Sequence, residues 1–283
     1  MFENSCQLKS YLKKESERTG ISIVNCYNTF FARSLLSRLG QLSYGELIVK
    51  GSFSQLAHLG TMIRPVTDID LISTTKDKNE TLLMLWNTFY EDNPEDGVRF
   101  DLTSLPKITK TGVIKIPIVA LFDKIRHPIN IDFDPGIKSV LEIHYDLVPR
   151  IFSGDKNFYI NTPSYEEILA EKLCIVVESN KKNVLNTRVK DFYDIYKMHN
   201  GKYDLEKFSN YFKVLLERRG KISLDSVNVE HLNKEYLEKH RQLWHDMSKK
   251  YEFLDKSVEF DEALFYTKGV ISEQIQKIKS KKF

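Results

Sequence analysis

The chain has 283 residues, which is enough for one large domain or two. Its 41% hydrophobic and 12% aromatic content excludes a disordered composition, and it has no run of about 18 apolar residues that could span a membrane. The formal net charge is +3, from 42 Lys and Arg against 39 Asp and Glu, so charge alone neither indicates nor excludes a nucleic-acid partner.

The first residues and the cysteines predict the compartment. The N-terminal segment lacks the basic and apolar regions of a secretory signal. Cys6, Cys26 and Cys174 are odd in number and far apart, so neither a disulfide framework nor a zinc site fits them. We therefore expect a reduced, cytoplasmic protein without a membrane segment.

Helices and strands alternate through the first part of the chain. Gly20 and Gly40 are expected just beyond the ends of the first two helices, and Pro117 favours an edge position for its strand. Helices are predicted over 3–18, 23–39, 52–60 and 78–90. Strands are predicted over 46–50, 67–73, 98–102, 111–122 and 129–134.

Two of these strand ends carry residues with recognisable chemistry. Gly51 and Ser52 follow an apolar strand and open a helix, and the free backbone N–H groups of a helix start bind phosphate. Asp68 and Asp70 are two residues apart in a strand, so their carboxylates share one face while Ile69 faces the core. Paired carboxylates suit Mg²⁺, which also takes phosphate oxygens and water. The two features together predict a site for a nucleotide and a metal ion.

A third carboxylate is expected from the strand at 129–134. Asp132 stands between Ile131 and Phe133, where it would face the pair at 68 and 70 from a neighbouring strand. Asp134 shares its face and is the alternative. We prefer Asp132, because Asp134 precedes Pro-Gly, where an acidic residue is common in turns.

The second part of the chain is predicted to be helical. We place a first domain at 1–160 and a helical domain at 161–283, with an α+β fold overall. Ser164 and Glu167 form a capping box that starts the first helix of the second domain. Further helices are predicted over 187–199, 204–219, 229–250 and 258–280.

Charged residues on the first two of these helices are further candidates. Lys172 falls within an apolar stripe, where it either extends along the helix surface to solvent or reaches a nucleotide phosphate. Asp191 flanks the apolar side of the next helix and is preferred to Asp194, although a simple pair with Arg188 is the alternative role. A basic cluster nearby could hold a nucleic-acid backbone or be ordinary solvated surface: Lys181, Lys182, Arg188 and Lys190.

Several of these motifs together resemble a known family. Gly51-Ser52, a helix, Arg64-Pro-Val-Thr67 and Asp68-Ile-Asp70 resemble the signature of the DNA polymerase β-like nucleotidyltransferases. The segments at 129–133, 166–173 and 188–194 are similar to the AbiEii/AbiGii nucleotidyltransferase-like toxins. One departure is Ser52, which stands where that family usually has a second glycine.

The resemblance implies a fold, an activity and partners. It implies a mixed sheet flanked by helices with a helical C-terminal domain, in a toxin of a type IV toxin–antitoxin system that acts in phage defence through abortive infection. Its activity would be Mg²⁺- or Mn²⁺-dependent transfer of nucleotides from an NTP to RNA, above all to the 3′ acceptor end of tRNA. A cognate antitoxin protein would neutralise it.

The resemblance also implies a role for each candidate residue. The metal ligands would be Asp68, Asp70 and Asp132. The nucleotide would be held by Gly51, Ser52, Arg64 and Lys172. In that family the Lys and Asp of the two helices belong to the active site, which here are Lys172 and Asp191.

Two other functions stay open. The chain could transfer a nucleotide to a protein, as small adenylating members of the superfamily do, or it could be a non-catalytic nucleotide-binding module. The helical domain and the local basic cluster favour RNA over protein. Three carboxylates together with Lys172 argue against a binding module, which has no need for Asp132.

Overall fold

The computed structural model describes residues 2–42, 47–74, 78–90, 96–136, 140–181, 188–199, 202–220, 222–251 and 254–280. The chain divides into two compact units, here called the N-terminal unit (Met1–Pro163) and the C-terminal unit (Ser164–Phe283). The boundary expected after residue 160 falls inside a strand, β8 (Phe158–Pro163), whose pairing with β7 (Ile143–Val148) was not evident from its sequence.

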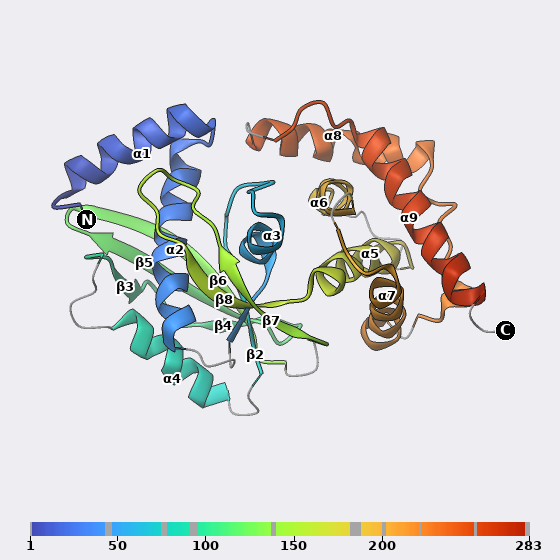
Figure 1. Cartoon of the computed structure of the whole chain (residues 1–283), viewed down its shortest axis with the longest axis horizontal. Helices are drawn as coiled ribbons and strands as arrows, with labels where there is room; N and C mark the ends of the chain where they lie inside the picture. Colours follow the sequence, from blue (N-terminus) through green and yellow to red (C-terminus); the bar gives the residue numbers. More distant parts are fainter. Residues whose placement is uncertain are drawn as a thin grey trace. The chain divides into compact units, whose positions relative to one another are not determined.

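The N-terminal unit combines helices with a mixed sheet (Figure 1). Its helices are α1 (Ser5–Thr19), α2 (Ile23–Leu42), α3 (Gly51–Leu59) and α4 (Lys78–Phe89). Its other strands are β1 (Leu47–Val49), β2 (Ile69–Ser73), β3 (Arg99–Leu102), β4 (Lys107–Ile108), β5 (Ile114–Phe122) and β6 (Ile125–Asp134). The strand order is β1-β2-β6-β5-β3, with β4 also on β5, while β7 and β8 form a second, two-stranded sheet.

The centre of the larger sheet carries the apolar core. In β6 the side chains of Ile129, Ile131 and Phe133 are buried, and they alternate with polar neighbours as a strand covered on one face requires. In the adjacent β2, Ile69 and Leu71 are buried in the same way. This alternation leaves the intervening acidic residues on the opposite face of the sheet.

The edge position expected for the strand containing Pro117 is wrong, because β5 lies between β6 and the β3 and β4 strands. The carbonyl of Pro117 accepts a hydrogen bond from the backbone N of Thr103 at 3.0 Å, on the side away from β6. Thr103 comes directly after the last residue of β3 and before β4. The missing N–H of Pro117 is tolerated on this side because β3 has ended there and β4 has not begun.

Gly40 also differs from its expected role. It was placed beyond the second helix, but α2 continues to Leu42 and Gly40 lies inside it. A Cβ at this position would lie 2.1 Å from the carbonyl oxygen of Tyr159 in β8. The glycine is therefore a site of close helix–strand packing and not a helix stop.

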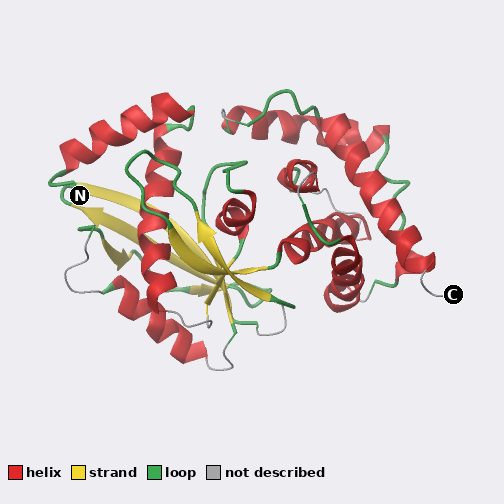
Figure 2. Ribbon diagram, in the orientation of Figure 1, coloured by secondary structure: helices red, strands yellow, loops and turns green. Residues whose placement is uncertain are grey.

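The described part of the C-terminal unit consists of helices and connecting loops (Figure 2). Its helices are α5 (Tyr165–Lys181), α6 (Lys190–His199), α7 (Leu205–Gly220), α8 (Lys234–Lys250) and α9 (Phe260–Ser280). The predicted cap of α5 is confirmed, since Ser164 Oγ accepts from the backbone N of Glu167 at 3.3 Å. None of the described helices is long and apolar enough to cross a membrane.

Candidate active site

Three charged residues form one row across the central strands of the N-terminal unit. Asp70 of β2 is the register partner of Asp132 in the parallel β6, and Asp132 is the register partner of Lys115 in the antiparallel β5. Register partners on adjacent strands point to the same face of a sheet. Asp70, Asp132 and Lys115 therefore share the face opposite the buried side chains of Ile131 and Phe133.

Lys115 holds the carboxylate of Asp132 directly. Its ammonium lies 2.8 Å from both Asp132 oxygens. This hydrogen bond is the main cause that raises the pKa of Lys115, and the charges of Asp68 and Asp70 raise it further. The negative field of all three acids thus acts on one point of the sheet surface. Lys115 was not among the candidates expected from the sequence, although its place between the apolar Ile114 and Ile116 puts it on the polar face of a strand.

Asp134 has a different role from Asp132. Its Oδ1 accepts a hydrogen bond from the backbone N of Gly136 at 2.9 Å, in the turn that follows β6. This is the ordinary use of an aspartate before Pro-Gly. Of the two candidate third acids, Asp132 is the one whose register partner is Asp70.

Gly51 lies against the carboxylate of Asp70. Its φ of +68° is in the left-handed region, and a Cβ there would lie 2.2 Å from Asp70 Oδ2. The backbone N of Lys50 also donates to the Asp70 carbonyl at 2.9 Å. The start of α3 and the acidic strand β2 are therefore in contact, and only glycine fits between them without strain.

Two further predicted nucleotide ligands, Ser52 and Arg64, contact each other at the same place. Arg64 Nη1 donates to Ser52 Oγ at 2.7 Å, and both side chains are buried. Thr67 Oγ1 donates to Asp68 Oδ1 at 3.0 Å and so orients that carboxylate. The start of α3 thus has a guanidinium beside it, which adds to the positive end of the helix dipole.

The donor set suits a divalent cation in its chemistry. Aspartate oxygens are the ligands that Mg²⁺ and Mn²⁺ prefer. The carboxylate of Asp132 already binds one cation, the ammonium of Lys115. Within the described ranges, no three His, Cys, Asp or Glu side chains are grouped closely enough to hold a metal ion by themselves. Asp132 is turned to Lys115, which leaves Asp68 and Asp70 as the pair suited to an ion.

In the C-terminal unit, Lys172 lies in a buried ion cluster. Its ammonium is 3.2 Å from Asp191 Oδ1 and 2.6 Å from Asp194 Oδ2, and both carboxylates are fully buried. The preference for Asp191 over Asp194 rested on the expectation that Asp194 points away from the apolar side of its helix. That expectation is wrong, because the spacing of positions 191 and 194 in α6 places both side chains toward Lys172 of α5. Arg188 Nε lies 2.8 Å from Asp191 Oδ2, as the alternative i, i+3 pairing anticipated.

The predicted basic cluster lies partly outside the described residues. Lys182 lies outside the described residues, as does the side chain of Lys181. Arg188 is exposed but approaches Asp191, and Lys190 is half-buried at the start of α6. The cluster as a nucleic-acid contact stays a prediction.

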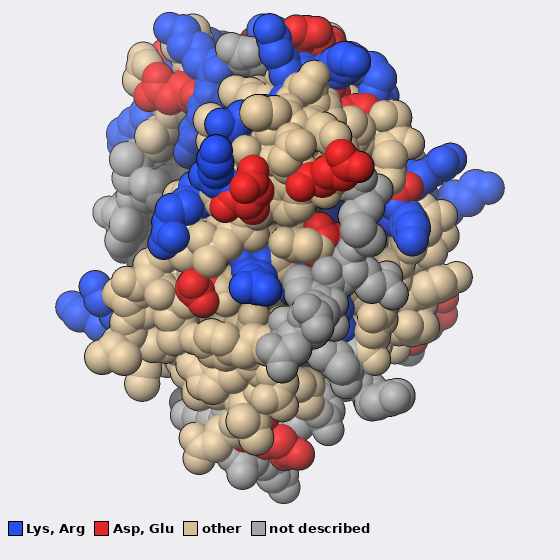
Figure 3. All heavy atoms as spheres, turned by 90° about the vertical axis from the view of Figure 1, so that its left-hand side faces the viewer, with Lys and Arg blue, Asp and Glu red and all other residues tan. Residues whose placement is uncertain are grey.

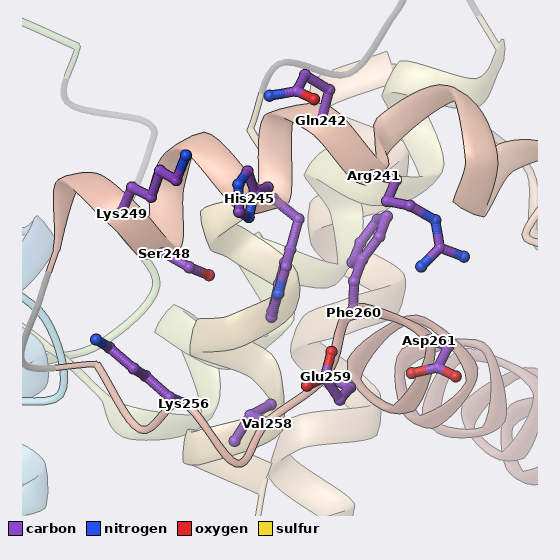
Figure 4. Close-up of a pocket in the computed structure, with 11 residues that line it drawn as sticks. Arg241, Gln242, His245, Ser248, Lys249, Lys256, Val258, Glu259, Phe260 and Asp261 are labelled. Carbon is purple, nitrogen blue, oxygen red and sulfur yellow. The ribbon is translucent and has the colours of Figure 1, made fainter.

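A cavity of about 660 Å³ lies along α8 and the start of α9 (Figure 4). Lys249 and Lys256 lie at one end, and Arg241 and Asp261 at the other. Its lining holds charges of both signs and none of the residues expected in the active site. The acidic residues Asp68, Asp70 and Asp132, here called the acidic row, therefore remain the candidate site, and the cavity is not part of it.

The view in Figure 3 shows Lys and Arg gathered in the upper part of one face, with Asp and Glu among them. The lower part of the same face carries few charges. A dedicated nucleic-acid surface is a patch or stripe of basic residues. This mixture of signs is not such a patch.

Several solved structures have a similar fold, including the following two. MenT4, a nucleotidyltransferase toxin from Mycobacterium tuberculosis H37Rv, matches with a TM-score of 0.59 and 14% identity, over 95% of this chain and 98% of that one. JHP933 from Helicobacter pylori matches with a TM-score of 0.50 and 14% identity, over 93% of this chain and 96% of that one. The fold is therefore that of the nucleotidyltransferase toxins.

The sequence itself identifies the family. Residues 34–266 match the family described as nucleotidyl transferase AbiEii toxin, Type IV TA system. The chain belongs to this family of nucleotidyltransferase toxins of type IV toxin–antitoxin systems, which confirms the resemblance and the α+β fold inferred from the motifs. No curated protein matches the sequence.

Proposed function

We propose that this toxin transfers nucleotides from an NTP to RNA, with the 3′ acceptor end of tRNA as its target, and so blocks translation. The observation that carries the proposal is the contact between the Gly51 helix start and Asp70, whose register partner is Asp132. A helix start of the kind that binds phosphate therefore lies beside two carboxylates, which supports the proposal. A cognate antitoxin, a cytoplasmic setting and a role in phage defence belong to the same proposal and rest on the family.

Each residue has a role that follows from its position. The helix start at Gly51 and Ser52, with Arg64 beside it, binds the triphosphate. Asp68 and Asp70 would hold Mg²⁺ or Mn²⁺, which supplies charge neutralisation for the triphosphate when bound. Asp132 orients the acceptor hydroxyl from the adjacent strand. Lys172 and Asp191, for which the family resemblance implies a role at the nucleotide, pair with each other within the C-terminal unit.

The transfer itself is a single displacement. The 3′-hydroxyl oxygen of the RNA bonds to the α-phosphorus, and the bond from that phosphorus to the bridging oxygen breaks. Pyrophosphate leaves, and the hydroxyl proton passes to water. The residues act mainly by holding the reactants in line and by stabilising charge, which is what nucleotidyl transfer requires.

The test of the metal-binding pair is Asp70→Asn in a transfer assay with labelled NTP and tRNA. Loss of one carboxylate charge at the reacting phosphates should lower the transfer rate by about 100-fold or more. Asp101→Asn is the matched control, because Asp101 is exposed on β3 in the same sheet and should leave the rate unchanged. Transfer by Asp70→Asn near the wild-type rate would remove the proposed mechanism.

The acceptor is tested separately. The purified chain is incubated with each labelled NTP in turn, together with tRNA or with a protein extract free of RNA. The proposal expects label in tRNA, at its 3′ end when the ends are sequenced. Label confined to protein would establish the alternative of a protein-modifying transferase. Binding of NTP without any transfer would establish the non-catalytic module.

A further inference from the structure

The contact between Lys115 and Asp132 has no part in the roles given above. The ammonium lies 2.8 Å from each of the two carboxylate oxygens. The side chain of Lys115 is 57% exposed and that of Asp132 is 28% exposed, so the pair lies at the surface of the sheet, where solvent can reach it. The carboxylate of Asp132 is therefore already paired with one full positive charge.

The neighbours of Lys115 indicate that the acidic row, and not β4, accounts for its position. Its register partner on β4 is Lys107, and like charges directly opposite on adjacent strands destabilise a sheet. Its register partner on β6 is Asp132, and the charges of Asp68 and Asp70 also act on it. The unfavourable pairing on one side is offset by three acids on the other.

A second metal ion at Asp132 would have to displace this ammonium. A dication and an ammonium within reach of one carboxylate repel each other. Both Asp132 oxygens are already bonded to Lys115, which leaves the pair Asp68 and Asp70 without a third acidic partner for a shared two-ion cluster. This agrees with the finding that no such three-ligand group exists among the described residues.

We propose that Lys115 serves as a fixed cation at Asp132 in place of a second metal ion, so that the site takes one divalent ion, at Asp68 and Asp70. Lys115 is thus a positioning residue that holds the carboxylate facing the acceptor hydroxyl. The proposal rests on the proposed function, since it concerns the same acidic row. It sets the number of divalent ions bound by Asp68, Asp70 and Asp132 at one.

The experiment counts Mn²⁺ ions bound to the whole chain without nucleotide, from the loss of the free Mn²⁺ signal in electron paramagnetic resonance. The wild-type chain is expected to bind one ion, and Lys115→Met two, since Asp132 is then released. Lys115→Gln provides a second, polar variant. Lys107→Met is the matched control, because it removes the same charge from the adjacent strand and should leave one ion bound.

Two further variants assign the ions to residues. Asp70→Asn should lose the wild-type ion, and Asp132→Asn in the Lys115→Met background should return the count from two to one. Two ions in the wild-type chain, or no additional ion in either Lys115 variant, would overturn the role of Lys115 while leaving the proposed transfer intact. A wild-type chain that binds no Mn²⁺ and transfers no nucleotide would overturn both.

Discussion

Lys172 is a proposed site residue whose contacts in the structure are those of a buried ion cluster. It was expected either to extend to solvent or to reach a phosphate, and its ammonium instead contacts two carboxylates that are fully buried. Loss of this ammonium would leave charge on the buried carboxylates less compensated, although Asp191 keeps its pair with Arg188. The effect of a Lys172 variant on stability must therefore be measured before any loss of activity is assigned to an active-site role.

Lys172→Met is expected to lower the free energy of unfolding of the C-terminal unit by about 3–5 kcal/mol. The measurement is urea unfolding followed by the fluorescence of Trp244, which lies in the same unit and packs on Phe260. Lys197→Met is the matched control, because its partner Asp255 is 44% exposed and such a pair contributes about 1 kcal/mol or less. Equal losses for both variants would contradict the buried cluster as a structural element.

At the scale of single elements, two helical glycines behave oppositely. Gly40 lies in α2, where a Cβ would be 2.1 Å from a backbone oxygen of β8. Gly269 lies in α9, and nothing stands within 4 Å of the position of its Cβ. The same substitution thus tests packing in one helix and intrinsic helix propensity in the other.

Gly40→Ala is expected to destabilise the N-terminal unit by about 1–3 kcal/mol, because α2 or β8 must shift to make room. Gly269→Ala is expected to stabilise the C-terminal unit by about 0.5–1 kcal/mol, because alanine loses less backbone entropy on folding. Thermal and urea unfolding of the two variants measure both effects. A stabilising Gly40→Ala would show that α2 and β8 are not packed as closely as described.

The glycines also show that a local sequence pattern does not always predict the role of a residue. Gly20 ends α1 with a φ of +72°, as its place in the sequence predicted. Gly40 has the same local signature, but its role depends on a strand more than a hundred residues further along the chain. Pro117 is similar, since its acceptance in an interior strand depends on where β3 and β4 end.

For the whole molecule, acid sensitivity follows from partly or fully buried imidazoles in both units. Burial lowers the pKa of His127 in the N-terminal unit. Burial also lowers the pKa of His199, His231 and His240 in the C-terminal unit. Each ring gains a proton in the unfolded chain at a higher pH than in the folded one. Their contribution to stability is therefore present above the ordinary pKa of 6.5 and declines as the pH falls below it.

The free energy of unfolding, measured by urea unfolding, is accordingly expected to fall as the pH is lowered from about 7.5 to about 5.5. The expected slope is up to about 1.4 kcal/mol per pH unit for each proton taken up. Trp86 reports on the N-terminal unit and Trp244 on the C-terminal unit. His127→Gln should weaken the pH dependence seen by Trp86. His245→Gln, with an exposed ring on α8, is the control and should leave both dependences unchanged. A midpoint that rises on acidification would contradict the assignment.

Local sequence patterns determined most of the elements and the family of this protein. The capping box at Ser164, the alternation around Asp68 and Asp70, and the Gly51-Ser52 helix start all depend on residues within a few positions of each other. Such short-range periodicities are set by backbone geometry and can be read without the fold. They also carry the motifs by which the AbiEii family is identified.

Only the tertiary structure determined which charged side chains are in contact. The register that aligns Asp70 with Asp132, and Asp132 with Lys115, arises from strand pairing and has no local signature. The contact of Lys172 with Asp194 arises in the same way from the packing of α5 on α6. The physical reason is that periodicity fixes the face on which a side chain lies, whereas its partner is fixed by how distant segments pair and pack.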